Sequence, residues 1–127
     1  MSKELLKYGI LIIGITLLAV LPASAAAQTD VFITRSNSSV ENNRPVTIYI
    51  DDVRVGTLMP GRRLETRVNN GNHTILVKIT PKKNKEISSD YYFTADDTKP
   101  ILLRINIEEE GILLLKKTVI IITLIED

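Results

Sequence analysis

The sequence contains no cysteine and no tryptophan, and it has a single histidine, His73, in 127 residues. Without cysteine the chain cannot form disulfides, cysteine-ligated zinc sites or iron–sulfur clusters, and it cannot use a thiol as a nucleophile. A zinc site needs three or four ligands, so His73 could join one only together with several carboxylates. The length suits one domain. We therefore expect a single fold that is held together by buried apolar side chains.

Aromatic side chains and net charge are also scarce. Only 5% of the residues are aromatic, and the formal net charge is +1. This near-neutral balance argues against a nucleic-acid partner. The charges are nevertheless uneven, because residues 54–85 carry eight basic residues and one acid, whereas residues 86–127 carry four basic residues and nine acids. The pattern fits either a bipolar docking surface or opposite charges that pair across a sheet, and we favour pairing.

The first 27 residues have the three-part pattern of a secretory signal. Lys3 and Lys7 give a basic start, and the uncharged apolar stretch "YGILIIGITLLAV" follows. "LPASAAAQ" then supplies the helix-breaking Pro22 and small residues at the spacing that a signal peptidase requires. We therefore predict that the protein is exported.

Two cleavage sites fit the spacing of small residues, after Ala25 or after Ala27, and we prefer the second. It divides the chain into a signal peptide, residues 1–27, and a single domain, residues 28–127. The alternative is an uncleaved anchor, because residues 8–27 carry no charge and are long enough to span a bilayer. We expect contact with a membrane only if the leader is retained.

Beyond the leader, apolar residues recur with the period of two that is typical of β-strands. In "DVFITR", for example, Val31 and Ile33 share one face and Phe32 lies on the other. Seven further β-rich segments follow, at residues 45–50, 53–58, 64–68, 73–79, 90–95, 101–107 and 118–125. The sequence therefore predicts an all-β fold, an antiparallel β-sandwich or open barrel of about 7–8 short strands, after an N-terminal signal helix.

Turn signals separate these segments. Met59–Gly61 suits a tight turn with Gly61 at positive φ, and Asn69–Asn72 contains Asn-Gly, the strongest short hairpin signal. The last segment is different, because Val119–Ile122 is an unbroken apolar run. Such a run fits a central strand covered on both faces or an exposed edge, and we favour the central strand.

The stretch from Val46 to Ile79 resembles the PEGA-type domains, which are small exported β-domains of bacteria. The matching residues are Tyr49, Asp51, Val55, Gly56, Gly71, His73, Ile75, Val77 and Ile79. Asp52 stands where glycine is usual, and Asn69–Asn70 stand where proline-rich turn residues are usual. The later segment "GILLLKKTV" fits the general layout of the family. The resemblance implies an extracytoplasmic display or interaction module, without a general catalytic activity or cofactor.

Asp51 and Asp52 are the residues that look most like a site, since they are adjacent carboxylates between two apolar runs. Neighbouring residues on a strand point to opposite faces, so the pair converges on one substrate only if the backbone turns there. A calcium loop would need several more oxygen ligands at fixed spacing. We favour a hairpin turn over a cation site or a catalytic pair. We interpret His73 as structural, because no nucleophile motif surrounds any serine.

These observations predict a non-catalytic exported module in the bacterial periplasm or at the cell surface, with no cofactor and no metal. Its partner would be an envelope protein or a cell-wall polymer. The alternative is a domain that binds carbohydrate or cell-wall polymer through rings and basic groups gathered on one face. The candidate partner or ligand surface consists of Tyr49, Arg62, Arg63, Arg67 and Tyr92.

Overall fold

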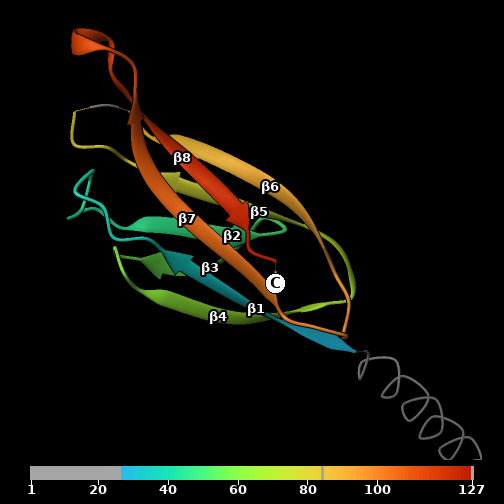
Figure 1. Cartoon of the computed structure of the whole chain (residues 1–127). Coiled ribbons are helices and arrows are strands. Elements are labelled where there is room, and N and C mark those ends of the chain that lie inside the picture. The colour runs from blue at the N-terminus through green and yellow to red at the C-terminus, as the bar shows by residue number, and fades with distance from the viewer. Residues whose placement is uncertain (1–26, 84, 127) are drawn as a thin grey trace, which may run out of the picture.

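The computed structural model describes residues 27–83 and 85–126, so the predicted signal helix lies outside the described residues. Within that part of the chain, no helix is long and apolar enough to cross a membrane. The strands are β1 (Gln28–Arg35), β2 (Val46–Ile50), β3 (Val53–Leu58), β4 (Arg63–Asn69), β5 (Gly71–Ile79), β6 (Ile87–Ala95), β7 (Ile101–Glu110) and β8 (Lys117–Leu124), and a single 3-10 turn, η1 (Leu113–Leu115), precedes β8 (Figure 1). The all-β prediction is confirmed, and each predicted segment corresponds to one strand.

The strands form two four-stranded sheets, which we name sheet A (β4-β1-β7-β8) and sheet B (β3-β2-β5-β6). All neighbouring strands are antiparallel except β1 and β7, which run parallel with Val31 opposite Ile101 and Arg35 opposite Ile105. The prediction of a purely antiparallel fold is therefore wrong at this pair. The reason is that alternation shows which face a residue occupies, but it does not show the direction of the neighbouring strand. Between β1 and β7 the chain crosses to sheet B and back twice, and it forms β4 on the first return.

The core lies between the two sheets and follows the predicted alternation. Val31 and Ile33 of β1 are completely buried, whereas Phe32 and Thr34 lie on the outer face of sheet A. Burial of one such aliphatic side chain contributes roughly 1.5–3 kcal/mol. The other fully buried aliphatic residues in the described chain, from both sheets, are Val46, Ile48, Ile75, Val77, Leu103, Ile105 and Ile107.

The apolar C-terminal strand β8 is an edge strand of sheet A, so the prediction of a central strand is wrong. Only Ile120 is buried in it, and Val119, Ile121 and Ile122 are half-buried. β8 contacts β6 at the edge of sheet B, and this contact covers part of the run. An edge strand that packs against another sheet and a central strand between two neighbours can have the same apolar composition. Composition alone therefore could not show which of the two positions β8 occupies.

Because the strands alternate in direction, the connections gather at two ends of the sandwich (Figure 1). At one end β7 extends beyond β1, since after Ile105 it pairs only with β8, up to Glu110 opposite Lys117. At about 3.4 Å per residue, this β7–β8 ribbon extends roughly 17 Å past the last β1 pair. We name this the hairpin end, and it also carries the connections 36–45 and 59–62 and the described residues 80–83 and 85–86 of the connection between β5 and β6. The opposite turn end carries residues 51–52, 70 and 96–100.

One charged side chain is buried at the hairpin end. Arg35 is only 2% exposed and lies on the same face of β1 as Val31 and Ile33. Its guanidinium donates to the carbonyl oxygens of Arg44 at 2.5 Å, Leu58 at 3.0 Å and Glu41 at 3.0 Å. Burial lowers the pKa of Arg35, against the attraction of the Glu41 carboxylate. Arg35 therefore attaches the 36–45 connection to the end of β3.

Candidate functional site

Asp51 and Asp52 form the two-residue turn between β2 and β3. Their φ angles are 50° and 67°, and positive φ at both central residues is the signature of the type I′ turn that suits a tight hairpin. The backbone N–H of Asp51 donates to the carbonyl oxygen of Thr74 at 2.9 Å. The interpretation of the pair as a turn is confirmed, and the predicted turn at Gly61 is confirmed too, with a φ of 77°.

His73 connects this turn to the next one. Its Nδ1 lies 2.5 Å from Oδ2 of Asp51, and its Nε2 lies 2.6 Å from the carbonyl oxygen of Asn69. A carbonyl oxygen and an ionised carboxylate can only accept, so both contacts are hydrogen bonds when the imidazole is protonated and both ring nitrogens donate. The second Asp51 oxygen accepts from the N–H of Thr74 at 3.0 Å. Both nitrogens of His73 are therefore already engaged, and neither can serve a nucleophile.

The pKa values of this pair agree with an ion pair. Burial lowers the pKa of His73, but the hydrogen bonds to Asp51 and Asn69 and the nearby carboxylate outweigh it and raise the pKa above its ordinary value. The hydrogen bond from His73, together with the Thr74 N–H, lowers the pKa of Asp51 although burial opposes it. The network joins the β2–β3 turn to the β4–β5 connection. It is a clamp between two turns at the turn end.

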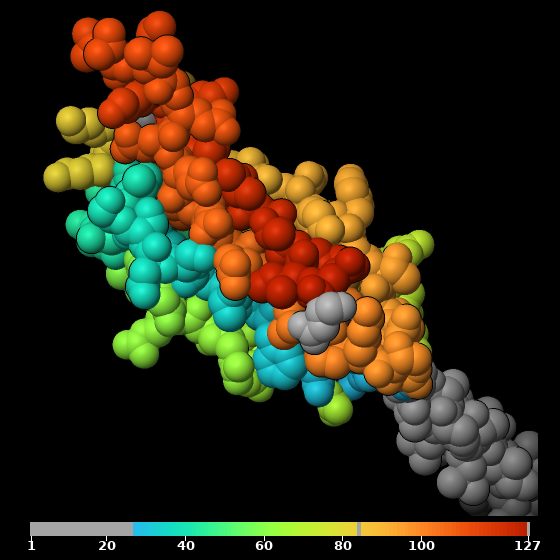
Figure 2. Space-filling view, viewed as in Figure 1, coloured from blue at the N-terminus to red at the C-terminus, as the bar shows by residue number. Residues whose placement is uncertain are grey.

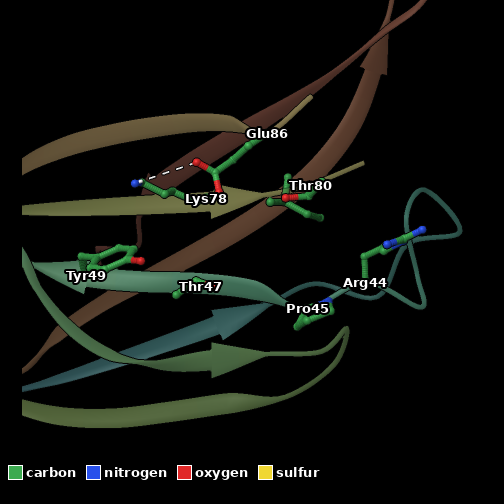
Figure 3. Close-up of a pocket in the computed structure, with 8 residues that line it drawn as sticks. Arg44, Pro45, Thr47, Tyr49, Lys78, Thr80 and Glu86 are labelled. Atoms are coloured by element: carbon green, nitrogen blue, oxygen red, sulfur yellow. Dashed lines mark ion pairs between the residues drawn. The ribbon is translucent and has the colours of Figure 1, made fainter. Parts of the chain in front are cut away.

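A hollow of about 240 Å³ lies on the outer face of sheet B (Figure 3). Tyr49 and Lys78 project from neighbouring strands into it, with the Lys78 ammonium 5.2 Å from the centre of the Tyr49 ring. Glu86 reaches back over the same strand and lies 3.9 Å from the Lys78 nitrogen. Tyr92 is on this face as well, on β6 opposite Thr74, and its ring is 75% exposed. The two predicted tyrosines therefore share one outer face.

The predicted arginines lie elsewhere. Arg63 and Arg67 are on the outer face of β4 in sheet A, on the opposite side of the sandwich from the tyrosines. Arg63 stacks over Phe32 at 5.0 Å and pairs with Glu65 at 2.6 Å, while Arg67 pairs with Asp30 at 2.9 Å. Arg62 is in the turn before β4 at the hairpin end. The structure thus does not bring Tyr49, Arg62, Arg63, Arg67 and Tyr92 together on one face.

The largest group of exposed apolar side chains among residues 27–83 and 85–126 was missed by the sequence analysis. Ile112, Leu113, Leu114 and Leu115 form the loop between β7 and β8, and their exposed fractions are 75%, 81%, 99% and 83%. We name these four residues the aliphatic tip. Figure 2 shows the loop as the outermost part of the projecting ribbon, clear of the sandwich body. The sequence does contain a signal for this loop, because the four apolar residues lie between a turn glycine, Gly111, and the charged residues Lys116 and Lys117.

The backbone of the aliphatic tip is tightly specified. Gly111 has a φ of 116°, and a Cβ there would collide with the carbonyl oxygen of Leu115. Leu113 has a φ of 56°, in the left-handed region that non-glycine residues rarely adopt. The N–H of Leu115 donates to the carbonyl oxygen of Ile112 at 3.0 Å and closes the turn. The tip is therefore a defined knob with its side chains pointing outward.

Among the described residues, no three side chains of His, Asp or Glu gather closely enough to ligate an ion. The acidic residues Asp96 and Asp97 are exposed in the connection after β6, and Glu108–Glu110 are exposed at the end of β7. Asp96 accepts hydrogen bonds from Thr98, which lower its pKa.

Comparisons with protein-family models, with curated proteins and with solved structures find no match to this chain. The residues that carry the PEGA resemblance lie on β2, β3 and β5, in the β2–β3 turn and at the start of β5. Two of them, Asp51 and His73, are the partners of the ion pair. The resemblance therefore coincides with a structural clamp.

Proposed function

We propose that the chain is an exported, non-catalytic β-sandwich that works as an interaction module of the bacterial envelope and docks through the aliphatic tip. The observation that carries this proposal is the exposure of four consecutive aliphatic side chains at the end of a projecting hairpin. Burial of one such side chain contributes roughly 1.5–3 kcal/mol, and in the isolated chain these four obtain almost none of it. Contiguous exposed apolar surface of this kind marks interaction sites.

The leader pattern and the resemblance to PEGA-type domains support the location. Export is tested by intact-mass measurement of the chain purified from the envelope of a bacterial host. A mass that begins at Gln28 is the expected result. A mass that includes residues 1–27 would instead show an anchored form, and a chain recovered only from the cytoplasm would contradict export.

The docking role is tested by a photoreactive residue placed at Leu114 in bacterial cells that produce the chain with its leader. Val53 provides the matched control, because it is an aliphatic residue that is 65% exposed but lies at the turn end. We expect adducts from position 114 and far fewer from position 53. Equal yields at the two positions would contradict docking through the tip.

A second candidate function is binding of a cell-wall polymer on the outer face of sheet B. The observation that favours it is that Tyr49 and the exposed Tyr92 share this face, where rings can stack on sugars. Co-sedimentation with purified cell-wall polymer tests it. Tyr92→Ala should reduce binding several-fold, while Ser88→Ala on the same strand should not. Equal binding by both variants would exclude this face.

A further inference from the structure

We propose that the aliphatic tip inserts into the surface of a lipid bilayer. This inference rests on the proposed function, since it names the partner that the same tip contacts. It also departs from the expectation that membrane contact would come only from a retained leader.

The distribution of apolar surface around the tip supports a lipid partner. The four side chains are each at least 75% exposed, so none of them packs against the sandwich and the apolar surface surrounds the loop. A protein pocket with a fixed shape contacts only some sides of a projecting loop. A bilayer solvates every side equally. A loop that is apolar all round therefore matches a bilayer better than a shaped pocket.

The size of the tip argues against a second copy of the chain as the partner. Four aliphatic side chains present on the order of 500 Å² of apolar surface. A stable protein–protein interface buries about 800 Å² on each partner. The residues next to the tip cannot readily extend the patch, because Glu108–Glu110 precede it and Lys116 and Lys117 follow it, all exposed. The apolar surface thus ends abruptly at a charged collar, which consists of these five residues.

The charged collar also sets how deep the tip can enter. Ionised groups are costly in the hydrocarbon region, so insertion stops where the ribbon becomes charged. Lysines at this level can reach lipid headgroups, and three glutamates oppose a strongly anionic surface. We therefore expect insertion to be driven by apolar contact and to depend little on anionic lipid. The charged collar has a formal net charge of −1, and Lys82, Lys83, Lys85 and Glu86 in the connection at the same end bring the total to +1, which is close to neutral.

The number of apolar carbons predicts a reversible contact. The tip has four side chains of four carbons each, about as many in total as a myristoyl chain, which binds bilayers with an association constant of about 10⁴ M⁻¹. A short loop enters less deeply than an acyl chain, so this constant is an upper bound. One tip therefore gives weak binding, which a retained leader or several tips would strengthen.

The experiment uses the chain from Gln28 onward, because all eight strands lie between Gln28 and Leu124. The absence of cysteine allows single labelling with an environment-sensitive dye after Leu114→Cys or, as the control, Val53→Cys. Vesicles of phosphatidylcholine, with and without a quarter of phosphatidylglycerol, are added to each. We expect a blue shift and a brighter signal at position 114, no change at position 53, and similar titrations with both lipids.

Flotation with the same vesicles compares three unlabelled chains. Replacement of all four tip residues by serine should lower binding by about tenfold or more. Gly111→Ala should distort the backbone of the turn but leave the four side chains of the aliphatic tip unchanged. A bilayer should tolerate this distortion, so Gly111→Ala should bind vesicles within about twofold of the parent chain. A protein pocket of fixed shape would instead bind the distorted tip much more weakly. Circular dichroism of each variant verifies the fold.

The outcomes separate the two proposals. A dye response at position 114 together with loss of flotation in the serine variant supports insertion. No response at position 114 overturns the lipid partner, and the interaction module survives only if the photoreactive residue at position 114 still forms protein adducts in cells. If neither lipid nor protein is contacted at position 114, both proposals fail. A sedimentation velocity run that shows dimerisation through the tip would also overturn the lipid partner.

Discussion

The two ends of the sandwich use polar and apolar residues in opposite ways. At the turn end, the carboxylate of Asp51 is half exposed and pairs with His73, so the charges lie near the surface. At the hairpin end, Arg35 is buried among backbone carbonyls, while the aliphatic tip stands in water. The hairpin end thus has a charge inside and apolar groups outside.

This difference shows which end is organised for stability alone. The arrangement at the turn end closes two connections with groups that satisfy one another. The arrangement at the hairpin end stabilises the base of the loops through Arg35, yet it leaves the apolar side chains of the tip without any partner in the described fold. Folding energetics explain the first pattern and the buried arginine, but they do not explain the tip. The tip is therefore where a function that depends on contact is expected.

The largest effect should come from breaking the base of the hairpin end. Arg35→Leu leaves three carbonyl oxygens, one of them in a buried hydrogen bond and two in partly buried ones, without their donor, and we expect the free energy of unfolding to fall by about 3 kcal/mol. Urea denaturation measures this. The stability of Arg35→Lys should lie between those of the parent chain and Arg35→Leu, because one ammonium cannot reproduce the fixed donor geometry of the planar guanidinium. Unchanged stability of Arg35→Leu would show that the cost of burying the charge cancels its hydrogen bonds.

A smaller effect, dependent on pH, should come from the turn end. The raised pKa of His73 means that its contribution is full below its ordinary value of about 6.5 and is lost as the pH rises through the raised value. The lowered pKa of Asp51 means that its contribution is present above its ordinary value of about 3.9 and is lost as the pH falls through the lowered value. The clamp is therefore strongest in mildly acidic solution.

The urea midpoint of the parent chain should be higher at about pH 5.5 than at about pH 9. The corresponding difference in the free energy of unfolding should be only on the order of 1 kcal/mol, because solvent screens the half-exposed carboxylate of Asp51. His73→Gln should remove most of this difference. Asp51→Asn should do the same, and the double variant should lose no more than either single one. Persistence of the pH dependence in His73→Gln would assign it to other groups.

A gain in stability is expected from one substitution in the tip. Leu113 has a φ of 56°, and a left-handed conformation costs a residue of this type roughly 1 kcal/mol. Asparagine tolerates this conformation better, so Leu113→Asn should raise the melting temperature slightly while it weakens docking. An unchanged or lower melting temperature would indicate that Leu113 contributes more to the fold than its exposure suggests.

The smallest effect on stability is expected at the most exposed position. Leu114 is 99% exposed, so Leu114→Ser should change the free energy of unfolding by less than about 0.5 kcal/mol. The same substitution should still reduce vesicle binding. A loss of stability without a loss of binding would reverse the assignment of the tip to contact rather than to folding.

The sequence predicted the elements of the fold well, because alternation and turn residues are local signals. Each strand was found, and so were the turns at Asp51, Asp52 and Gly61. The hairpin signal at Asn69–Asn72 was wrong, because the flanking strands β4 and β5 belong to different sheets and do not pair. The parallel β1–β7 pair and the edge position of β8 could not be predicted, since they depend on the partners that each strand finds across the molecule. Arg35 could have been found, because alternation places it on the face of Val31 and Ile33.

The candidate site was harder to predict. Tyr49 and Tyr92 share a face, as the polymer-binding alternative requires, but Arg63 and Arg67 lie on the other sheet. The sequence pattern does not show which sheet a strand joins, so it could not show that the arginines lie apart from the tyrosines. The tip was missed because "ILLL" has the composition of a core strand. What keeps it outside is the β7–β8 register, in which Glu110 pairs with Lys117 and forces the four residues into the loop.

The parallel pairing of β1 with β7 should slow folding, because it joins segments that are far apart in the sequence. β1 is the first strand to be synthesised and lies in the interior of sheet A, yet Val31 pairs with Ile101, 70 positions later. The β2–β3 and β5–β6 hairpins can form as soon as they emerge, but sheet A cannot be completed until nearly the whole chain is available. Folds dominated by such distant contacts form in milliseconds to seconds. β1 can pair with β4 once residues 63–69 are available, but its other neighbour in sheet A, β7, is added only with the last third of the chain.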